Sequence, residues 1–269
     1  MRGLVLAAGL GTRLRPLTDD VPKPLLPVVA RPMIEHALAL LYSAGLLDVA
    51  VNAHHRADLV ADYFRYGSCF WQRVTMSREE PDVLGTGGAI KRLHAWLEGS
   101  DPFVVTNGDT ISKPDLNVAL DAHKKSGALA TMILRRDERA ERYGVVATDA
   151  DGAVVDVAGL AGKSGSDGGL FIGTSILSSA IFNHMPDEDI FCVIRKVYAP
   201  LLRVRPEPCA RSTRTRRFSI SARRRITPTL NSRCSRTQTF AAFFRTRSSV
   251  WSSWSRASLY HRQPRSPRT

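Results

Sequence analysis

The amino-acid sequence predicts an α/β fold: a Rossmann-like, doubly wound and mostly parallel sheet with a β-hairpin insertion. Strand and helix patterns alternate over the first 135 residues, and two β runs around a tight turn follow after residue 140. The protein-like pattern then stops near residue 203. We therefore expect one domain over residues 1–203 and a separate tail over residues 204–269.

The alternating region contains short strand-like runs, and the first of them, GLVLAA, is continuously apolar, as expected of a strand that is buried on both faces. These predicted strands are residues 3–8, 48–53, 73–77, 102–109 and 128–136. Between them, apolar residues recur at helical spacing, which predicts helices over residues 32–45, 57–64, 86–97 and 116–127. In a parallel sheet of this kind, ligands bind beyond the carboxyl ends of the strands.

After residue 140 the pattern changes to shorter β runs. Residues 143–157 contain two of them around Asp151-Gly152, a dipeptide typical of hairpin turns. A further strand is predicted over residues 168–178 and a helix over residues 189–202. This region should therefore supply the hairpin insertion and complete the sheet.

Residues 204–269 differ from the rest of the chain in composition. They contain 16 arginines, no lysine and one acidic residue, Glu207, so their formal charge is +15, against −2 for the other residues. Natural basic arms usually mix lysine with arginine, and few aromatic residues alternate with the basic ones here, so we do not expect a nucleic-acid partner. GC-rich coding DNA read in the wrong frame gives such a composition. We therefore expect a tail that is frame-shifted and disordered.

The overall composition favours a cytoplasmic protein that does not contact membranes. No apolar run approaches the length of about 18 residues that a membrane-spanning helix needs. Met1-Arg2-Gly3 leaves no room for a signal peptide before the first predicted strand. The four cysteines lack C-x-x-C spacing, which favours free thiols in a reducing compartment. The oligomeric state stays open.

The first candidate site follows the first predicted strand. Gly9 and Gly11 let backbone N–H groups approach an anion. Arg13 adds a forked cation that suits phosphate oxygens. Lys23 stands between two prolines, which stiffen the backbone that carries its ammonium group. Two cations beside a glycine-rich loop predict a polyphosphate site.

Other glycine-rich sites fit this segment less well. A P-loop would need Gly-Lys-Ser/Thr after four spacers, and a dinucleotide-binding fingerprint would need a glycine where the chain has Leu14. A purely structural turn explains Gly9 and Gly11, but not Arg13 together with Lys23.

The stretch LAAGLGTRLRPLTDDVPKPLLPV, residues 6–28, resembles the signature of the sugar-1-phosphate nucleotidyltransferases. Further matches are AVNAHH, LGTGGAI, VVTNGD, YGVV and GGLFIGTSIL, so the resemblance covers about residues 1–203. It is nearest to short bacterial mannose-1-phosphate guanylyltransferases, and the N-acetylmuramate-1-phosphate uridylyltransferases are similar in length and motif. The resemblance implies the nucleotidyltransferase fold. It also implies attack of a sugar 1-phosphate on the α-phosphorus of an NTP, GTP or UTP, which releases pyrophosphate.

The resemblance also implies roles for individual residues. Arg13, Lys23 and Asp109 would be catalytic by neutralising phosphate charge, with Asp109 as a ligand of Mg²⁺, which prefers oxygen ligands. The nucleotide would contact Ala8, Gly9, Gly11, Thr12, Arg13, Lys23, Gly85, Gly87 and Asn107. The alternatives are a plain Asn-Gly-Asp turn at Asp109 and a helix N-cap loop at Gly85 and Gly87.

Lys163 marks a departure from the family pattern. Family members often carry Glu-Lys-Pro where this chain has Gly162-Lys163-Ser164. The lysine of that motif contacts the sugar phosphate, so Lys163 is the candidate for this contact. Its altered neighbours leave the composition of the sugar pocket open.

The family usually carries a second metal-binding aspartate near the C-terminus, in F/W-x-D-x-G-T-P, and the sequence lacks such a segment. Codons for Ser219–Thr227 can be chosen so that a shifted frame encodes Asp-Leu-Gly-Thr-Pro-Ala-Asp-Tyr. We hypothesise that the reading frame is displaced shortly after Leu202, which would leave the chain weakly active or inactive. A non-catalytic nucleotide-binding or sugar-phosphate-binding homologue is the alternative function, and pyrophosphate release separates the two.

Overall fold

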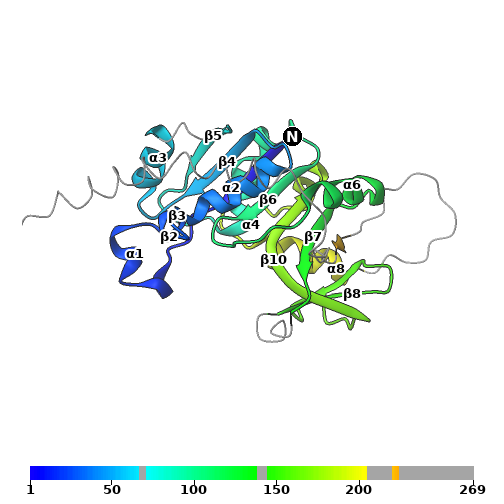
Figure 1. The fold of residues 1–269 in the computed structure, drawn as a ribbon. Helices are drawn as coiled ribbons and strands as arrows, with labels where there is room; N and C mark the ends of the chain where they lie inside the picture. The colour runs from blue at the N-terminus through cyan, green and yellow to red at the C-terminus, as the bar shows by residue number, and fades with distance from the viewer. Residues whose placement is uncertain (67–70, 138–143, 205–219, 224–269) are drawn as a thin grey trace, which may run out of the picture. The chain divides into compact units, whose positions relative to one another are not determined.

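A nine-stranded sheet runs through the residues that the computed structural model describes, which are 1–66, 71–137, 144–204 and 220–223 (Figure 1). They belong to one unit, Met1–Ile226, and the second unit, Thr227–Thr269, lies outside the described residues. Within the sheet the strand order is β11-β7-β10-β6-β1-β4-β5, and β8 and β9 extend it beside β10. The predicted α/β fold is confirmed.

The parallel half of the sheet contains the strands that precede the candidate site residues. Its strands are β1 (Arg2–Leu6), β4 (Asp48–Ala53), β5 (Arg73–Arg78) and β6 (Phe103–Asn107). β1 pairs in parallel with both β4 and β6, and β4 with β5. Their carboxyl ends therefore lie along one edge of the sheet, where the sequence predicts the site.

The other half of the sheet departs from simple strand alternation. β10 (Asp167–Leu177) inserts between β6 and β7 (Ala130–Arg135) and is antiparallel to both. β8 (Val145–Thr148) and β9 (Val154–Val157) form the predicted antiparallel hairpin, and β8 also pairs with β10. The strands predicted over residues 102–109 and 128–136 are therefore not neighbours, because a strand from much later in the chain separates them.

Helices and short turns connect these strands. The longer helices are α2 (Met33–Ser43), α3 (Ala57–Tyr66), α4 (Gly85–Arg92) and α6 (Leu116–Ser126). Shorter elements are η1 (Thr12–Leu14), α1 (Leu17–Asp20), η2 (Lys23–Leu25), β2 (Pro27–Val28), β3 (Arg31–Pro32), α5 (His94–Leu97), η3 (Ser179–His184), η4 (Ile194–Tyr198) and α8 (Ala199–Arg203).

Two predicted helices differ in the structure. The helix expected over residues 86–97 is divided at Leu93 into α4 and α5. The helix expected over residues 189–202 is absent at its start, because Phe191 bonds through its backbone to the beginning of α4 instead. The helical part of that segment is η4 followed by α8.

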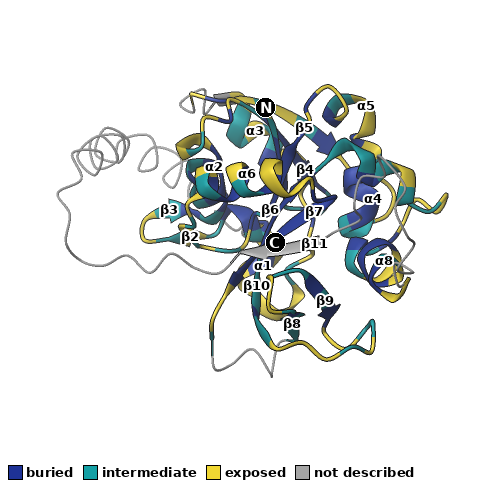
Figure 2. Cartoon of the chain, turned by 90° about the vertical axis from the view of Figure 1, so that its right-hand side faces the viewer, coloured by how far each residue is buried: buried dark blue, intermediate teal, exposed yellow. Residues whose placement is uncertain are grey.

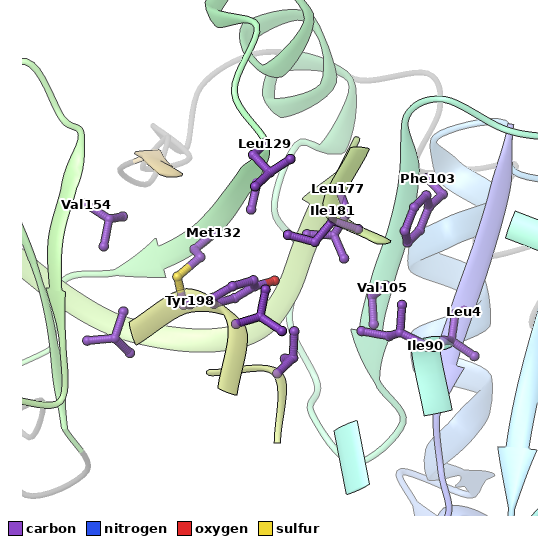
Figure 3. Close-up of a cluster of buried hydrophobic side chains, with 14 of the residues drawn as sticks. Leu4, Ile90, Phe103, Val105, Leu129, Met132, Val154, Leu177, Ile181 and Tyr198 are labelled. Atoms are coloured by element: carbon purple, nitrogen blue, oxygen red, sulfur yellow. The ribbon is translucent and has the colours of Figure 1, made fainter. Parts of the chain in front are cut away.

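The sheet buries a separate apolar cluster on each face, because successive residues of a strand point to opposite sides. Val5 of β1 packs with α2, α3 and α6 on one face, whereas Leu4 packs on the other face with α4, η4 and α8. Figure 3 shows the second cluster, including Tyr198 of η4 and Ile90 of α4. Figure 2 shows the central strands mostly buried and the helices partly exposed.

The predicted tail over residues 204–269 lies almost entirely outside the described residues. The exceptions are Val204 and β11 (Ile220–Arg223), a strand that the sequence did not predict, which pairs in parallel with β7. It contains part of the segment Ser219–Thr227, and the frame-shift hypothesis itself stays a prediction. In the described part of the chain, no helix is long and apolar enough to span a membrane.

His123 on α6 should make stability depend on pH. Its buried ring bonds to Thr131 Oγ1 at 2.8 Å and Ser178 Oγ at 3.2 Å. Burial lowers the pKa of this imidazole below its usual 6.5, and the charge of Asp101 opposes part of that effect. The unfolded chain therefore binds a proton that the folded chain does not. Folding with a neutral His123 therefore costs nothing above the pKa of this histidine in the unfolded chain. As the pH falls below that pKa, the free energy of unfolding decreases.

Urea unfolding at two pH values tests this expectation. Between about pH 8 and pH 5.5 the unmodified chain should lose more of its free energy of unfolding than the His123→Gln variant. An identical pH response in the two proteins would contradict the prediction.

Candidate active site

The loop after β1 is held in a fixed shape by the residues that follow it. Gly11 has a φ of +65°, in the left-handed region that favours glycine. A Cβ there would lie 2.9 Å from Thr18 Cγ2 and 3.1 Å from Lys23 Cβ. The buried Thr18 hydroxyl donates a hydrogen bond of 3.0 Å to the Gly11 carbonyl. The loop is thus folded against α1 and η2, and Lys23 lies beside it.

Gly9, in the same loop, has no comparable structural reason to be glycine. It is exposed, its φ is not positive, and a Cβ on it would meet no atom within 4 Å. Thr12 and Arg13 in η1 are exposed as well, whereas Ala8 is buried. Among the described residues Arg13 has no ion-pair partner. The loop therefore presents open backbone and an unpaired guanidinium to solvent.

Lys23 and Asp109 meet although 86 residues separate them. Lys23 begins η2 between Pro22 and Pro24, and its ammonium group forms an ion pair with the Asp109 carboxylate. The side chain of Lys23 is 21% exposed and that of Asp109 is 40% exposed, so a ligand in solvent can reach both. Asp109 is placed there because Gly108 N donates to Leu6 O at 2.8 Å, which extends the pairing of β6 with β1. The structure thus brings together two of the three predicted catalytic residues.

Asn107 ends β6 and lies opposite Leu6 of β1. Its side chain packs over Gly173, where a Cβ would lie 2.6 Å from Asn107 Nδ2. Gly173 has a φ of +79° and falls where the register of β10 shifts between Phe171 and Ser175. Asn107 is therefore at the same edge of the sheet as Asp109, as the sequence predicts.

The glycines at the start of α4 are crowded by the chain itself. A Cβ on Gly85 would lie 2.7 Å from the Phe191 carbonyl oxygen, and one on Gly87 would lie 2.2 Å from the Phe191 ring. On Gly88 a Cβ would lie 2.0 Å from the carbonyl oxygen of Asp189. Gly87 N also donates to Phe191 O at 2.9 Å. Packing of residues 189–191 therefore explains these glycines, and their contact with a nucleotide base stays a prediction.

The hydrogen-bond partner of Lys163 lies in α8 and is not part of the Lys23–Asp109 pair. Its ammonium group donates to the carbonyl of Leu202 near the end of α8, and Arg203 donates to Leu160 O at 2.7 Å and 2.9 Å. These bonds attach the loop after β9 to α8. The structure thus gives Lys163 a structural partner, and its contact with a sugar phosphate stays a prediction.

Two buried polar residues that were not predicted from the sequence, Asn52 and Glu79, lie at the carboxyl ends of β4 and β5. Asn52 Oδ1 accepts from Ala7 N at 2.6 Å, Asn52 Nδ2 donates to Glu79 Oε1 at 2.7 Å, and Leu84 N donates to Glu79 Oε2 at 2.9 Å. The available signal was Asn52 itself, a polar residue inside the apolar run DVAVNA. These side chains connect the loop after β1 with the loop before α4.

His54 and His55 bind separate backbone carbonyls. His54 Nδ1 lies 2.8 Å from Glu79 O, and His55 Nε2 lies 3.1 Å from Thr18 O. Each of the two histidines thus has a backbone partner from another part of the chain. In the described part of the chain, no group of three His, Cys, Asp or Glu side chains could hold a metal ion.

Curated relatives with similar sequences are sugar-1-phosphate nucleotidyltransferases. A UTP–glucose-1-phosphate uridylyltransferase of Synechocystis sp. is 36% identical over 166 residues, which is 58% of this chain and 43% of the relative. A mannose-1-phosphate guanyltransferase of Candida albicans is 37% identical over 153 residues, or 56% of this chain and 42% of the relative. The chain thus spans less than half the length of the curated relatives it matches.

Solved structures with a similar fold cover more of the chain. HddC from Yersinia pseudotuberculosis, crystallised with GMP-PN, has a TM-score of 0.63 and 25% identity over 83% of this chain and 90% of its own. An apo UDP-glucose pyrophosphorylase has a TM-score of 0.64 at 21% identity, over 83% and 89% of the two chains, and supports the fold alone.

The profile of the nucleotidyl transferase family matches residues 2–159, which is more than half of the chain. This region contains the loop after β1, the Lys23–Asp109 pair and the start of α4. The chain therefore belongs to the nucleotidyl transferase family.

Proposed function

We propose that this chain transfers a nucleotidyl group from an NTP to a sugar 1-phosphate, with release of pyrophosphate. The observation that carries the proposal is the pairing of Lys23 with Asp109 beside the glycine loop, at the carboxyl edge of the parallel strands. This edge is where sheets of this kind bind ligands. The pair supplies a cation for the phosphates and a carboxylate for their counter-ion.

We also propose a cytoplasmic location for the protein.

The loop after β1 would hold the triphosphate. Exposed backbone at Gly9 and the unpaired guanidinium of Arg13 supply donors for phosphate oxygens. Lys23 adds a point charge on a stem that its neighbouring prolines hold in place. Stabilisation of charge on the leaving pyrophosphate by such preplaced cations is an established source of catalysis.

Asp109 would hold Mg²⁺. This ion usually binds through one or two carboxylates and takes its other ligands from phosphates and water. A single, partly exposed carboxylate beside the phosphate loop suits that pattern. The bound ion would neutralise phosphate charge, and Lys23 would then pair with phosphate oxygens as well as with Asp109.

The proposal also names the base and the sugar of the substrates. Guanylyl transfer to mannose 1-phosphate is our first candidate, as in the relative from Candida albicans. Uridylyl transfer is the second, because the relative from Synechocystis sp. carries that activity in its name and shares 36% identity. We propose low activity for this chain, because the segment that should carry the second aspartate is missing.

A panel of reactions tests the function. GTP and UTP, each with mannose 1-phosphate or glucose 1-phosphate and Mg²⁺, should release pyrophosphate with one combination preferred. The same panel on a chain restored in frame after Leu202 should give a higher rate. If both proteins bind an NTP but release no pyrophosphate with any sugar phosphate, the non-catalytic alternative is correct.

Asp109→Asn should abolish most of the Mg²⁺-dependent turnover. The change removes the negative charge but keeps the size of the side chain. We expect a loss of about 100-fold or more in kcat/KM and a change of less than about 1 kcal/mol in stability, since the ion pair is partly exposed. Asp121→Asn, on the exposed side of α6, is the matched control and should alter neither quantity. Equal turnover in the two variants would reject Asp109 as a metal ligand.

Gly9→Ala separates ligand binding from folding. The added methyl meets no protein atom, so the free energy of unfolding should stay within about 0.5 kcal/mol of the unmodified chain. The methyl occupies the space that we assign to phosphate, so KM for the NTP should rise about ten-fold or more. An unchanged KM would place the triphosphate elsewhere.

A further inference from the structure

Three consecutive hydrogen bonds join Ala7 to Leu84 through the side chains of Asn52 and Glu79. The direction of each bond fixes the next one. Because Asn52 Oδ1 accepts from Ala7 N, the amide nitrogen of Asn52 must face Glu79. Both oxygens of Glu79 then accept, one from Asn52 and one from Leu84 N. With an amide at position 52, this series of bonds therefore requires a carboxylate at position 79.

Neither side chain can change partners at low cost. Asn52 is 3% exposed and Glu79 is fully buried, and a buried polar group without a partner is strongly destabilising. The backbone of Glu79 is also fixed, since its N–H donates to Ala53 O at 2.9 Å and its carbonyl lies 2.8 Å from His54 Nδ1. The carboxylate is thus held rigidly between the two loops.

We propose that Glu79 is a positioning residue that, through Asn52, sets the spacing between the loop after β1 and the loop before α4. Both loops follow the carboxyl ends of parallel strands, so a ligand at this edge lies against both. The inference rests on the proposed function, because that ligand is the NTP. Glu79 itself touches no ligand. It fixes the backbone of Ala7 and of Leu84 from behind.

Two single substitutions break the chain of bonds in different ways. In Glu79→Gln the new amide has one oxygen for two donors, so its nitrogen must face either Asn52 Nδ2 or Leu84 N. In Asn52→Asp two carboxylates face each other, acceptor against acceptor. Each variant therefore leaves one contact unsatisfied, and both variants nearly keep the original shape.

The double variant Asn52→Asp/Glu79→Gln should restore all three bonds with the middle one reversed. The new carboxylate accepts from Ala7 N and from the new amide nitrogen, and the new amide oxygen accepts from Leu84 N. The total charge of the pair is unchanged. Rescue by this exchange depends on the proposed bonds, whereas general damage to the fold would add up in the double variant.

Two measurements compare the single variants with the double variant. Calorimetric titration with GTP and with UTP, in the presence of Mg²⁺, should give Kd values about ten-fold higher in each single variant and near the original in the double variant. Hydrogen exchange at the amides of Ala7 and Leu84 should be faster in both single variants. This includes exchange at Ala7 in Glu79→Gln, although residue 79 does not contact Ala7. The control is Ser100→Ala, which removes a bond of 2.8 Å to Arg2 N at the opposite end of β1 and should change neither quantity.

The outcomes separate this inference from the proposed function. A double variant that is no better than the single variants, or that does not fold, overturns the role of Glu79. The same holds if the single variants lose only thermal stability and keep the original Kd. If the unmodified chain binds neither GTP nor UTP, the proposed function fails, and exchange at Ala7 in Glu79→Gln still decides whether Glu79 couples the loops.

Discussion

The alignment of the carboxyl ends of β1, β4, β5 and β6 is the constraint on which the candidate site depends. Parallel pairing brings the residues that follow each strand to one edge, but pairing alone would leave the loops free to move. Cross-links between the loops then fix them. Lys23 bonds to Asp109, Asn52 bonds to Ala7, and His55 bonds to the Thr18 carbonyl. The loop after β1, whose residues Gly9, Thr12 and Arg13 are exposed, is thereby held by the sheet.

The glycines of this edge serve two different purposes. Gly11, Gly85 and Gly87 are required by their own chain, because a Cβ on any of them would collide with Thr18 or Phe191. Gly9 faces open space, so the fold tolerates a larger residue there. From the sequence motif alone, all four glycines are simply residues of glycine-rich loops, and their roles cannot be distinguished. Only the surrounding atoms separate a glycine that packing requires from one that a ligand could require.

Much of the fold could be predicted because strand and helix periods are local properties of the chain. The motif and the end of strand 102–109 placed Lys23 and Asp109 in one expected site, but their direct ion pair could not be predicted from the sequence. The insertion of β10 between β6 and β7 could not be predicted, because strand order depends on contacts between distant residues. The same reason hid Glu79, whose partners Asn52 and Leu84 are identifiable only once β4 and β5 are paired. The helix predicted over residues 189–202 was wrong at its start, because the backbone of Phe191 bonds to α4. Helical spacing of apolar residues cannot reveal such a contact.

A crystal structure of the chain with Mn²⁺ and a non-hydrolysable GTP or UTP analogue tests the central claim most directly. The account predicts an anomalous manganese peak at the Asp109 carboxylate, with the triphosphate against Gly9–Arg13 and within reach of the Lys23 ammonium group. A well-ordered analogue bound away from this loop, or a manganese peak that Asp109 does not ligate, would contradict it.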